Sequence, residues 1–251
     1  MKKSILLSVI LFVLAFTVNA QNDTMYIMKS GVVVGMYDVN TQVDSVIFYK
    51  PDIQPGNTFV DARDGNIYQI VTIGTQVWMA ENLKYLPGVV GPTTSSKTDP
   101  YYYVYGYDGT NVAEAKATSN YNTYGVLFNW PAAVVSCPAG WHLPSDAEWT
   151  VLTDYLGGIA VAGGKLKETG TAHWNEPNEG ATNETGFTAL PGGDRNYTEV
   201  FTDNGNFGYW WSSLENTTDY AWYRGMRYTA GNVFENYYFK RNGFSVRCVK
   251  N

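Results

Sequence analysis

Cys137 and Cys248 are the only two cysteines in this 251-residue chain. If they pair, the bridge closes a loop of about 100 residues, which in the chain-entropy account stabilises a fold by about 4.7 kcal/mol or less. Such a bridge would hold the last strand against residues near the middle of the chain. The alternative is two buried free thiols, and the choice depends on the compartment in which the chain folds.

The first 20 residues are typical of a cleavable export signal. Lys2 and Lys3 are followed by an almost wholly apolar run, residues 4–16, and then by Thr17-Val18-Asn19-Ala20. A membrane anchor is the alternative, but a span needs about 20 apolar residues and this run is shorter. We therefore expect a secreted, periplasmic or cell-surface product with no transmembrane segment in the mature chain.

Cleavage after Ala20 would leave Gln21 at the N-terminus. No cysteine stands there, so we do not expect a lipid anchor. Export also leads to an oxidising compartment, which favours the disulfide over free thiols.

The composition excludes some partners. The chain has a net charge of -6, whereas nucleic-acid binding needs clustered Lys and Arg. Tyrosine is the most abundant aromatic residue, with 20 copies, and suits both wet binding surfaces and loop-rich cores. Two distant cysteines and two histidines make a poor metal site.

The chain divides into four predicted parts. Residues 1–20 form the signal, and 21–50 form a short strand-rich segment. Residues 51–57 contain two prolines and a glycine, which indicates a linker, and 58–251 form the main domain. The alternating runs of the strand-rich segment are 25–28, 32–37 and 43–49.

The main domain is predicted to be α+β, with small antiparallel sheets, one or two short helices and long loops. The best helix covers 146–156, because Ser145 can cap it and Glu148 completes a capping box. A further helix over 161–168 is weaker, and a short one is expected near 128–135. Residues 87–123 and 171–206 are expected to be mostly loops, and strands return from Tyr209 to Val249.

An ordered set of motifs spans roughly residues 58–251. It resembles the FISUMP family, the Fibrobacter succinogenes major paralogous domain, whose members are mostly exported proteins without an assigned biochemical role. The matching segments are Asp64-Gly65-Asn66, Trp78 to Leu83, Cys137 to Trp149, Gly186-Phe187, Leu190 to Gly193, Trp211-Ser212-Ser213 and Ser245 to Val249.

A more distant resemblance is to the C-type lectin-like fold, including its formylglycine-generating-enzyme branch, through Leu143 to Trp149 and Gly243 to Cys248. Enzymes of that branch bind copper with a C-terminal cysteine pair, which this chain lacks. Neither His142 nor His173 lies near a nucleophile motif. We expect no enzyme activity and name no catalytic residue, since a shared fold does not transfer an activity.

The binding hypothesis begins with Glu176-Pro177-Asn178, because in sugar-binding C-type lectins such a triplet coordinates calcium and sugar hydroxyls. Glu176, Asn178 and Glu184 are the candidate calcium ligands, since Ca²⁺ takes six to eight oxygen ligands. Asp194 adds another oxygen ligand. Against a lectin site, no Trp-Asn-Asp motif follows, and oxygen-rich loops are usually solvated turns.

Trp210 and Trp211 are the other ligand-binding candidates. They are adjacent, so in a strand they point to opposite faces, and one could form an exposed stacking platform for a sugar or a protein. The alternative is that loops cover both rings.

Three functions remain open at this point. The first is an exported, non-enzymatic binding or surface-interaction module with a carbohydrate or protein ligand. The second is a structural domain that decorates a surface assembly, and the third is a secreted enzyme with an unrecognised site.

Overall fold

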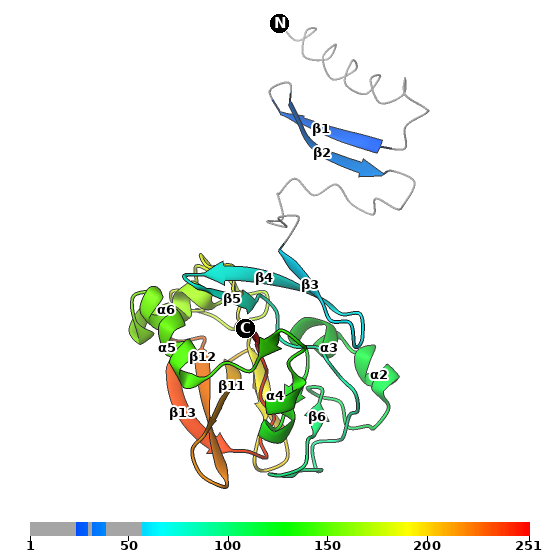
Figure 1. Ribbon diagram of the computed structural model, residues 1–251, viewed down its shortest axis with the longest axis vertical. Helices are drawn as coiled ribbons and strands as arrows, with labels where there is room; N and C mark the ends of the chain where they lie inside the picture. The colour runs from blue at the N-terminus through cyan, green and yellow to red at the C-terminus, as the bar shows by residue number, and fades with distance from the viewer. Residues whose placement is uncertain (1–23, 30–31, 39–56) are drawn as a thin grey trace, which may run out of the picture. The chain divides into compact units, whose positions relative to one another are not determined.

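The computed structural model describes residues 24–29, 32–38 and 57–251 and divides the chain into two units, Met1–Asp52 and Ile53–Asn251. In the first unit, β1 (Thr24–Lys29) and β2 (Val32–Asp38) pair as an antiparallel hairpin (Figure 1). The predicted signal 1–20, the third predicted strand and residues 51–56 of the predicted linker lie outside the described residues.

The second unit contains two five-stranded sheets (Figure 1). The first has the order β3-β4-β5-β14-β8, so the C-terminal strand lies between two strands that come much earlier in the chain. Its strands are β3 (Thr58–Val60), β4 (Ile67–Ile73), β5 (Gln76–Met79), β8 (Trp141–His142) and β14 (Val249–Lys250).

The second sheet has the order β10-β9-β11-β12-β13, and only the β9–β11 contact is parallel. A two-stranded ribbon, β6 (Tyr102–Tyr103) with β7 (Leu127–Phe128), completes the strands of this unit. The second sheet is formed by β9 (Gly192–Arg195), β10 (Phe201–Asn204), β11 (Phe207–Glu215), β12 (Tyr220–Arg227) and β13 (Phe234–Phe239).

Five helices occur in the described part of the chain: α2 (Val112–Lys116), α3 (Ser119–Tyr124), α4 (Trp130–Ser136), α5 (Asp146–Tyr155) and α6 (Ile159–Leu166). The capping box predicted for α5 is present, and none of these helices is long and apolar enough to span a bilayer.

The α+β class is confirmed, but the expected one or two helices were too few. The segment 87–123, predicted to be mostly loops, contains α2 and all but the last residue of α3. Their N-caps explain them: the side chains of Asn111 and Thr118 accept hydrogen bonds from free backbone N–H groups. Short capped helices of five or six residues carry too little apolar periodicity to be recognised in a sequence.

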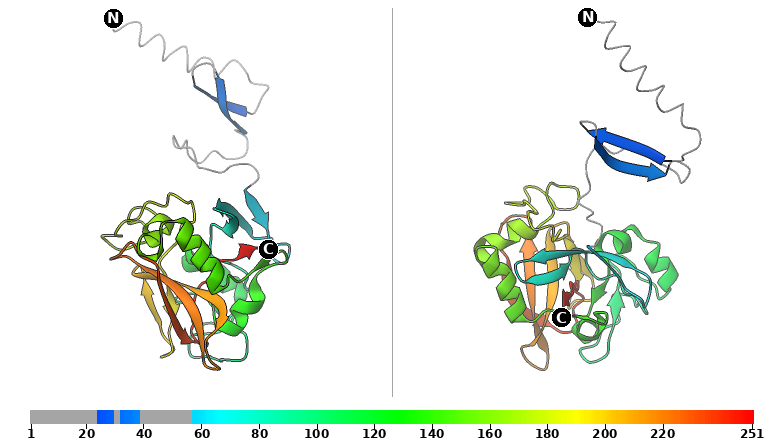
Figure 2. Two further views of the ribbon diagram at one scale, coloured as in Figure 1. Left: turned by 60° about the vertical axis from the view of Figure 1, so that its left-hand side comes forward. Right: turned by 45° about the horizontal axis from the view of Figure 1, so that its top comes forward.

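The two faces of the second sheet contribute to two different hydrophobic clusters. Trp211 and Tyr223 belong to one cluster, whereas Trp210 and Met226 belong to the other, with Trp149 of α5. Helices α5 and α6 therefore cover part of one face, while the β11–β12 hairpin continues beyond them (Figures 1 and 2).

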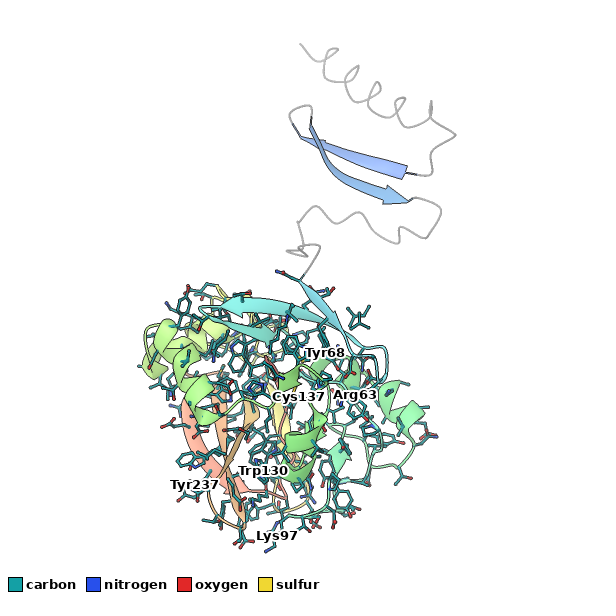
Figure 3. All side chains as sticks on the ribbon, viewed as in Figure 1. Arg63, Tyr68, Lys97, Trp130, Cys137 and Tyr237 are labelled. Atoms are coloured by element: carbon teal, nitrogen blue, oxygen red, sulfur yellow. A yellow bond between two sulfur atoms is a disulfide. The ribbon has the colours of Figure 1, made fainter. Side chains whose placement is uncertain are left out.

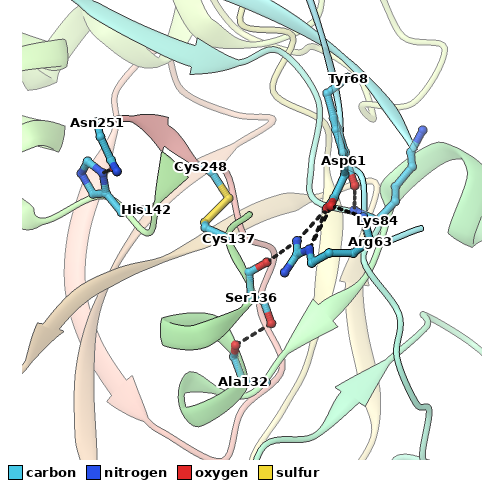
Figure 4. The surroundings of a disulfide bond; sticks show 10 residues. All are labelled: Asp61, Arg63, Tyr68, Lys84, Ala132, Ser136, Cys137, His142, Cys248 and Asn251. Carbon is cyan, nitrogen blue, oxygen red and sulfur yellow. Dashed lines mark hydrogen bonds and ion pairs between the residues drawn. A yellow bond between two sulfur atoms is a disulfide. The ribbon is translucent and has the colours of Figure 1, made fainter. Parts of the chain in front are cut away.

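Cys137 and Cys248 form a disulfide, as predicted (Figure 4). Cys137 ends α4 and Cys248 directly precedes β14, so the bridge joins the middle of the chain to its last strand. Next to it, Arg63 pairs with Asp61 at 2.6 Å and donates to the carbonyl of Ser136 at 2.8 Å. The bridge therefore lies beside a hydrogen-bonded ion pair, with Cys248 buried and Cys137 partly buried.

We expect the double substitution Cys137→Ala and Cys248→Ala to lower the free energy of unfolding by about 2–4 kcal/mol, because the unfolded chain loses its cross-link. Urea denaturation of the exported protein measures this change. Reduction of the wild-type protein should have the same effect and should leave the double variant unchanged. Equal stability of the oxidised wild type and the variant would contradict the prediction.

Candidate functional site

Neither tryptophan of the predicted stacking platform is accessible. Trp210 and Trp211 point to opposite faces as expected, but both are fully buried. Trp210 Nε1 donates to Asn82 Oδ1 at 2.9 Å, and Trp211 Nε1 donates to the carbonyl of Phe128 at 2.7 Å. The sheet has a hydrophobic cluster on each side at this point. Of the two alternatives, an exposed ring or two covered rings, the structure has two covered rings.

The three candidate calcium ligands have different surroundings, and the buried Asn178 Oδ1 has no hydrogen-bond partner among the described residues. Asn178 is buried, and its amide nitrogen donates to the carbonyls of Glu168 and Gly170. Glu184 pairs with Lys165 at 3.1 Å, and Glu176 is exposed. Within residues 57–251, no three His, Cys, Asp or Glu side chains form a group that could hold a metal ion. Calcium binding stays a prediction that rests on the sequence.

Asp194 is a buried acid on β9, not a surface ligand. Its side chain is 6% exposed and accepts a hydrogen bond from Thr202 Oγ1 at 2.6 Å. Burial raises the pKa of this carboxyl to about 7, and the negative charge of Asp203 acts in the same direction. Asp194 therefore changes its charge inside the fold near neutral pH.

Both histidines are hydrogen bonded to carboxylates. His142 contacts Glu148 Oε1 through Nε2 and the amide oxygen of Asn251 through Nδ1, each at 2.6 Å. His173 Nδ1 lies 2.8 Å from a carboxylate oxygen of Glu168. These contacts tie chain segments together and bring neither ring to a serine hydroxyl.

Several residues of the motifs that carry the family resemblance lie in the interior. Asn82 is buried, and its amide nitrogen donates to Ser245 Oγ at 3.2 Å while its oxygen accepts from Arg247 Nη2 at 3.0 Å. The fully buried Arg247 guanidinium also donates to the carbonyls of Met79 and Phe187. Buried polar groups are costly unless they are bonded in this way, so these motif residues specify the fold.

A group of partly exposed aromatic side chains lies on β12 and β13. It is on the same face of the second sheet as Trp210, past the part of that face that α5 covers. We call the side chains of Tyr220, Trp222, Tyr237 and Phe239 the aromatic strip. The register pairs Tyr220 with Phe239 and Trp222 with Tyr237. Directly opposite residues of antiparallel strands share a face, so all four rings lie on one side of the sheet.

The rings of the strip contact one another. Their centroids are 4.6 Å apart for Tyr220–Phe239, 5.4 Å for Trp222–Tyr237 and 5.8 Å for Tyr220–Tyr237. Tyr237 is 44% exposed, and the other three are partly exposed. These distances are within the range of favourable aromatic pairs, so the strip is one connected surface.

Ion pairs mark where the strip begins. Arg224, the next residue on the same face of β12, pairs with Asp146 at the start of α5 and with Glu235 on β13, each at 3.2 Å. On one side of these pairs α5 covers the sheet. On the other side the aromatic rings face solvent, and Figure 3 shows Tyr237 on the outer side of the domain.

A hollow of about 270 Å³ adjoins the strip. We define it by its lining residues, Lys97, Asp219, Phe239 and Arg241. Lys97 and Asp219 form an ion pair of 2.5 Å, and the guanidinium carbon of Arg241 lies 4.7 Å from the centre of the Phe239 ring. Phe239 therefore belongs to both the strip and the hollow.

Reasoning from the sequence missed this surface, although part of its signal was present. The patterns Tyr-Ala-Trp at 220–222 and Tyr-Tyr-Phe at 237–239 place aromatic residues at every second position of two predicted strands. What the sequence lacked was the register that sets one pair beside the other.

We expect Asp194 to contribute a loss of stability as pH rises from about 4 to about 7. Its pKa of about 7 in the folded protein lies above the ordinary aspartate value of 3.8, so as pH rises the unfolded chain loses this proton before the folded chain does. The variant Asp194→Asn cannot ionise. It should match the wild type near pH 4 and exceed it by roughly 2–4 kcal/mol at pH 8.

Urea denaturation at several pH values measures this difference, and Asp154→Asn, which changes an exposed acid on α5, is the matched control. A stability difference between Asp194→Asn and the wild type that does not change with pH would contradict the assignment.

Comparisons with known proteins agree with the motif analysis. The model of the family described as the Fibrobacter succinogenes major domain matches residues 71–250. Neither the search of curated proteins nor the search of solved structures found a match. The matched region includes both five-stranded sheets except β3 and part of β4. The chain belongs to the Fibrobacter succinogenes major domain family.

Proposed function

We propose that this protein is an exported, non-enzymatic binding module that holds a carbohydrate against the aromatic strip. The observation that carries the proposal is a connected, solvent-facing set of four aromatic rings on one face of β12 and β13. One face of a sugar ring consists largely of C–H groups and packs on an aromatic ring, while tyrosine hydroxyls can hydrogen bond sugar hydroxyls.

The partial exposure of these rings supports a binding role. Fully burying an aromatic side chain stabilises a fold by about 1.5–3 kcal/mol, so exposed rings leave part of that energy unused. Contiguous apolar patches on a folded surface commonly mark interaction sites. In the same sheet, Trp210 and Trp211 are fully buried, so the partial exposure of the strip contrasts with its surroundings.

The size of the strip favours a sugar over a protein partner. It has two rows of two rings, with neighbouring strands about 5 Å apart and alternate residues about 7 Å apart along a strand. A standard protein interface covers about 800 Å² on each partner, which is much larger. One or two stacked sugar rings fit the smaller area.

The C-type lectin-like fold is part of this proposal. The position of α5 shortly after Cys137, the terminal strand beside Cys248 and the irregular segment between α6 and β9 are consistent with it. In the proposed mode the sugar binds at β12 and β13, not at Glu176-Pro177-Asn178. Stacking does not require a metal ion, so we expect binding to persist in EDTA.

We expect Trp222→Ala and Tyr237→Ala each to weaken binding about tenfold, because each removes one stacking ring and a tenfold change corresponds to about 1.4 kcal/mol. Affinity electrophoresis against a panel of plant and bacterial polysaccharides identifies a glycan that retards the wild type. Calorimetry with an oligosaccharide of that glycan then gives the dissociation constants.

Tyr155→Ala is the matched control, since Tyr155 is an exposed tyrosine of α5 outside the strip. It should bind like the wild type. Equal binding by all the variants would exclude the strip as the site. No retardation by any glycan would favour the structural, surface-decorating role, and loss of binding in EDTA would favour the calcium site.

A further inference from the structure

The charged side chains around the hollow do not cancel one another. Lys97 and Asp219 neutralise each other at 2.5 Å. Among residues 57–251, the Arg241 guanidinium has no carboxylate within ion-pair distance. The neighbouring Lys240 is buried and pairs with Glu215 at 2.7 Å. The four residues that line the hollow therefore carry a net charge of +1 in a chain whose net charge is -6.

We infer that the hollow binds the carboxylate of an acidic sugar residue while a sugar ring stacks on the aromatic strip. This inference rests on the proposed function and names the ligand class, a uronic-acid-containing glycan. A guanidinium has a fixed fork of donors that matches a carboxylate, and such charge-assisted pairs are stronger than neutral hydrogen bonds.

Phe239 connects the two parts of the site. Its ring packs on Tyr220 within the strip at 4.6 Å, and the Arg241 guanidinium carbon lies 4.7 Å from its centre. The guanidinium is thus held beside the ring by a cation–π contact. A sugar bound at this end of the strip is next to an unpaired positive charge.

Lys97 has an indirect role. It is far from Asp219 in sequence, at a separation of 122 residues, and it belongs to the long loop that precedes β6. By pairing with Asp219, Lys97 neutralises the negative charge of that carboxylate. Without Lys97, the charge of Asp219 would repel an acidic ligand and would attract Arg241. Lys97 is therefore a positioning residue for the charge of Arg241.

The test compares uronic acid trisaccharides with their carboxyl-reduced, neutral counterparts by calorimetry on the mature protein. Galacturonate, glucuronate and mannuronate trisaccharides are used as probes. We expect the wild type to prefer at least one acidic trisaccharide over its neutral partner by about tenfold, the effect of one charged hydrogen-bonded pair. The preference should fall with added salt.

Two variants should change the preference in opposite directions. Arg241→Gln should abolish the preference for the acidic trisaccharide, whereas Asp219→Asn should increase it. Circular dichroism and Tm confirm that both variants fold. Trp222→Ala should lower the affinity for the acidic and the neutral trisaccharide by the same factor, because it removes a stacking ring and changes no charge.

The outcomes separate the two claims. Equal affinity of the wild type for acidic and neutral trisaccharides, with loss of both in Trp222→Ala, overturns the inference and retains the proposed function. If binding of an acidic trisaccharide depends on Arg241 and not on Trp222, the claim that a sugar stacks on the aromatic strip is overturned. The claim that the hollow binds a carboxylate then stands. No binding of any trisaccharide overturns the inference, and no retardation of the wild type on the polysaccharide panel overturns the proposed function.

Discussion

The side-chain amide of Asn82 joins the segments on which the rest of the main domain depends. Its oxygen accepts from Trp210 and Arg247, and its nitrogen donates to Ser245 and to the carbonyl of Tyr124. These five residues come from four separate segments of the chain and meet in the interior. Burial lowers the pKa of Arg247 to about 9, so its guanidinium remains charged at neutral pH and must be satisfied by oxygen atoms. The Asn82 oxygen supplies part of that requirement.

This arrangement separates the recognisable part of the sequence from the part that we propose to be functional. The family motifs contain Trp78, Asn82, Trp211, Arg247 and Cys248, all of which are buried. They fix the two sheets relative to each other within the domain. The aromatic strip and the hollow lie outside these motifs, on β12 and β13 and the loops beside them. Membership of the family therefore establishes the architecture and leaves the ligand to be found from the surface.

Local signals in the sequence predicted several elements correctly. Ser145 and Glu148 define the start of α5, and the two cysteines are bridged. Non-local features were missed for a physical reason. The burial of Trp210 and Trp211 depends on what packs on each face of the sheet, and the strip depends on the register of β12 against β13. A residue pattern gives the alternation of side chains along one strand but not the partner that covers or extends it.

The central claim is that ligand binds at the partly exposed Trp222 and not at the buried Trp210 and Trp211 or the loop 171–188. It is tested most directly by the indole N–H signals of the eight tryptophans in a ¹H–¹⁵N spectrum, recorded while a uronic acid trisaccharide is added. The account predicts a progressive shift of the Trp222 indole signal, with those of Trp210 and Trp211 unchanged. An unmoved Trp222 signal together with shifts of the backbone amides of 171–188 would contradict it.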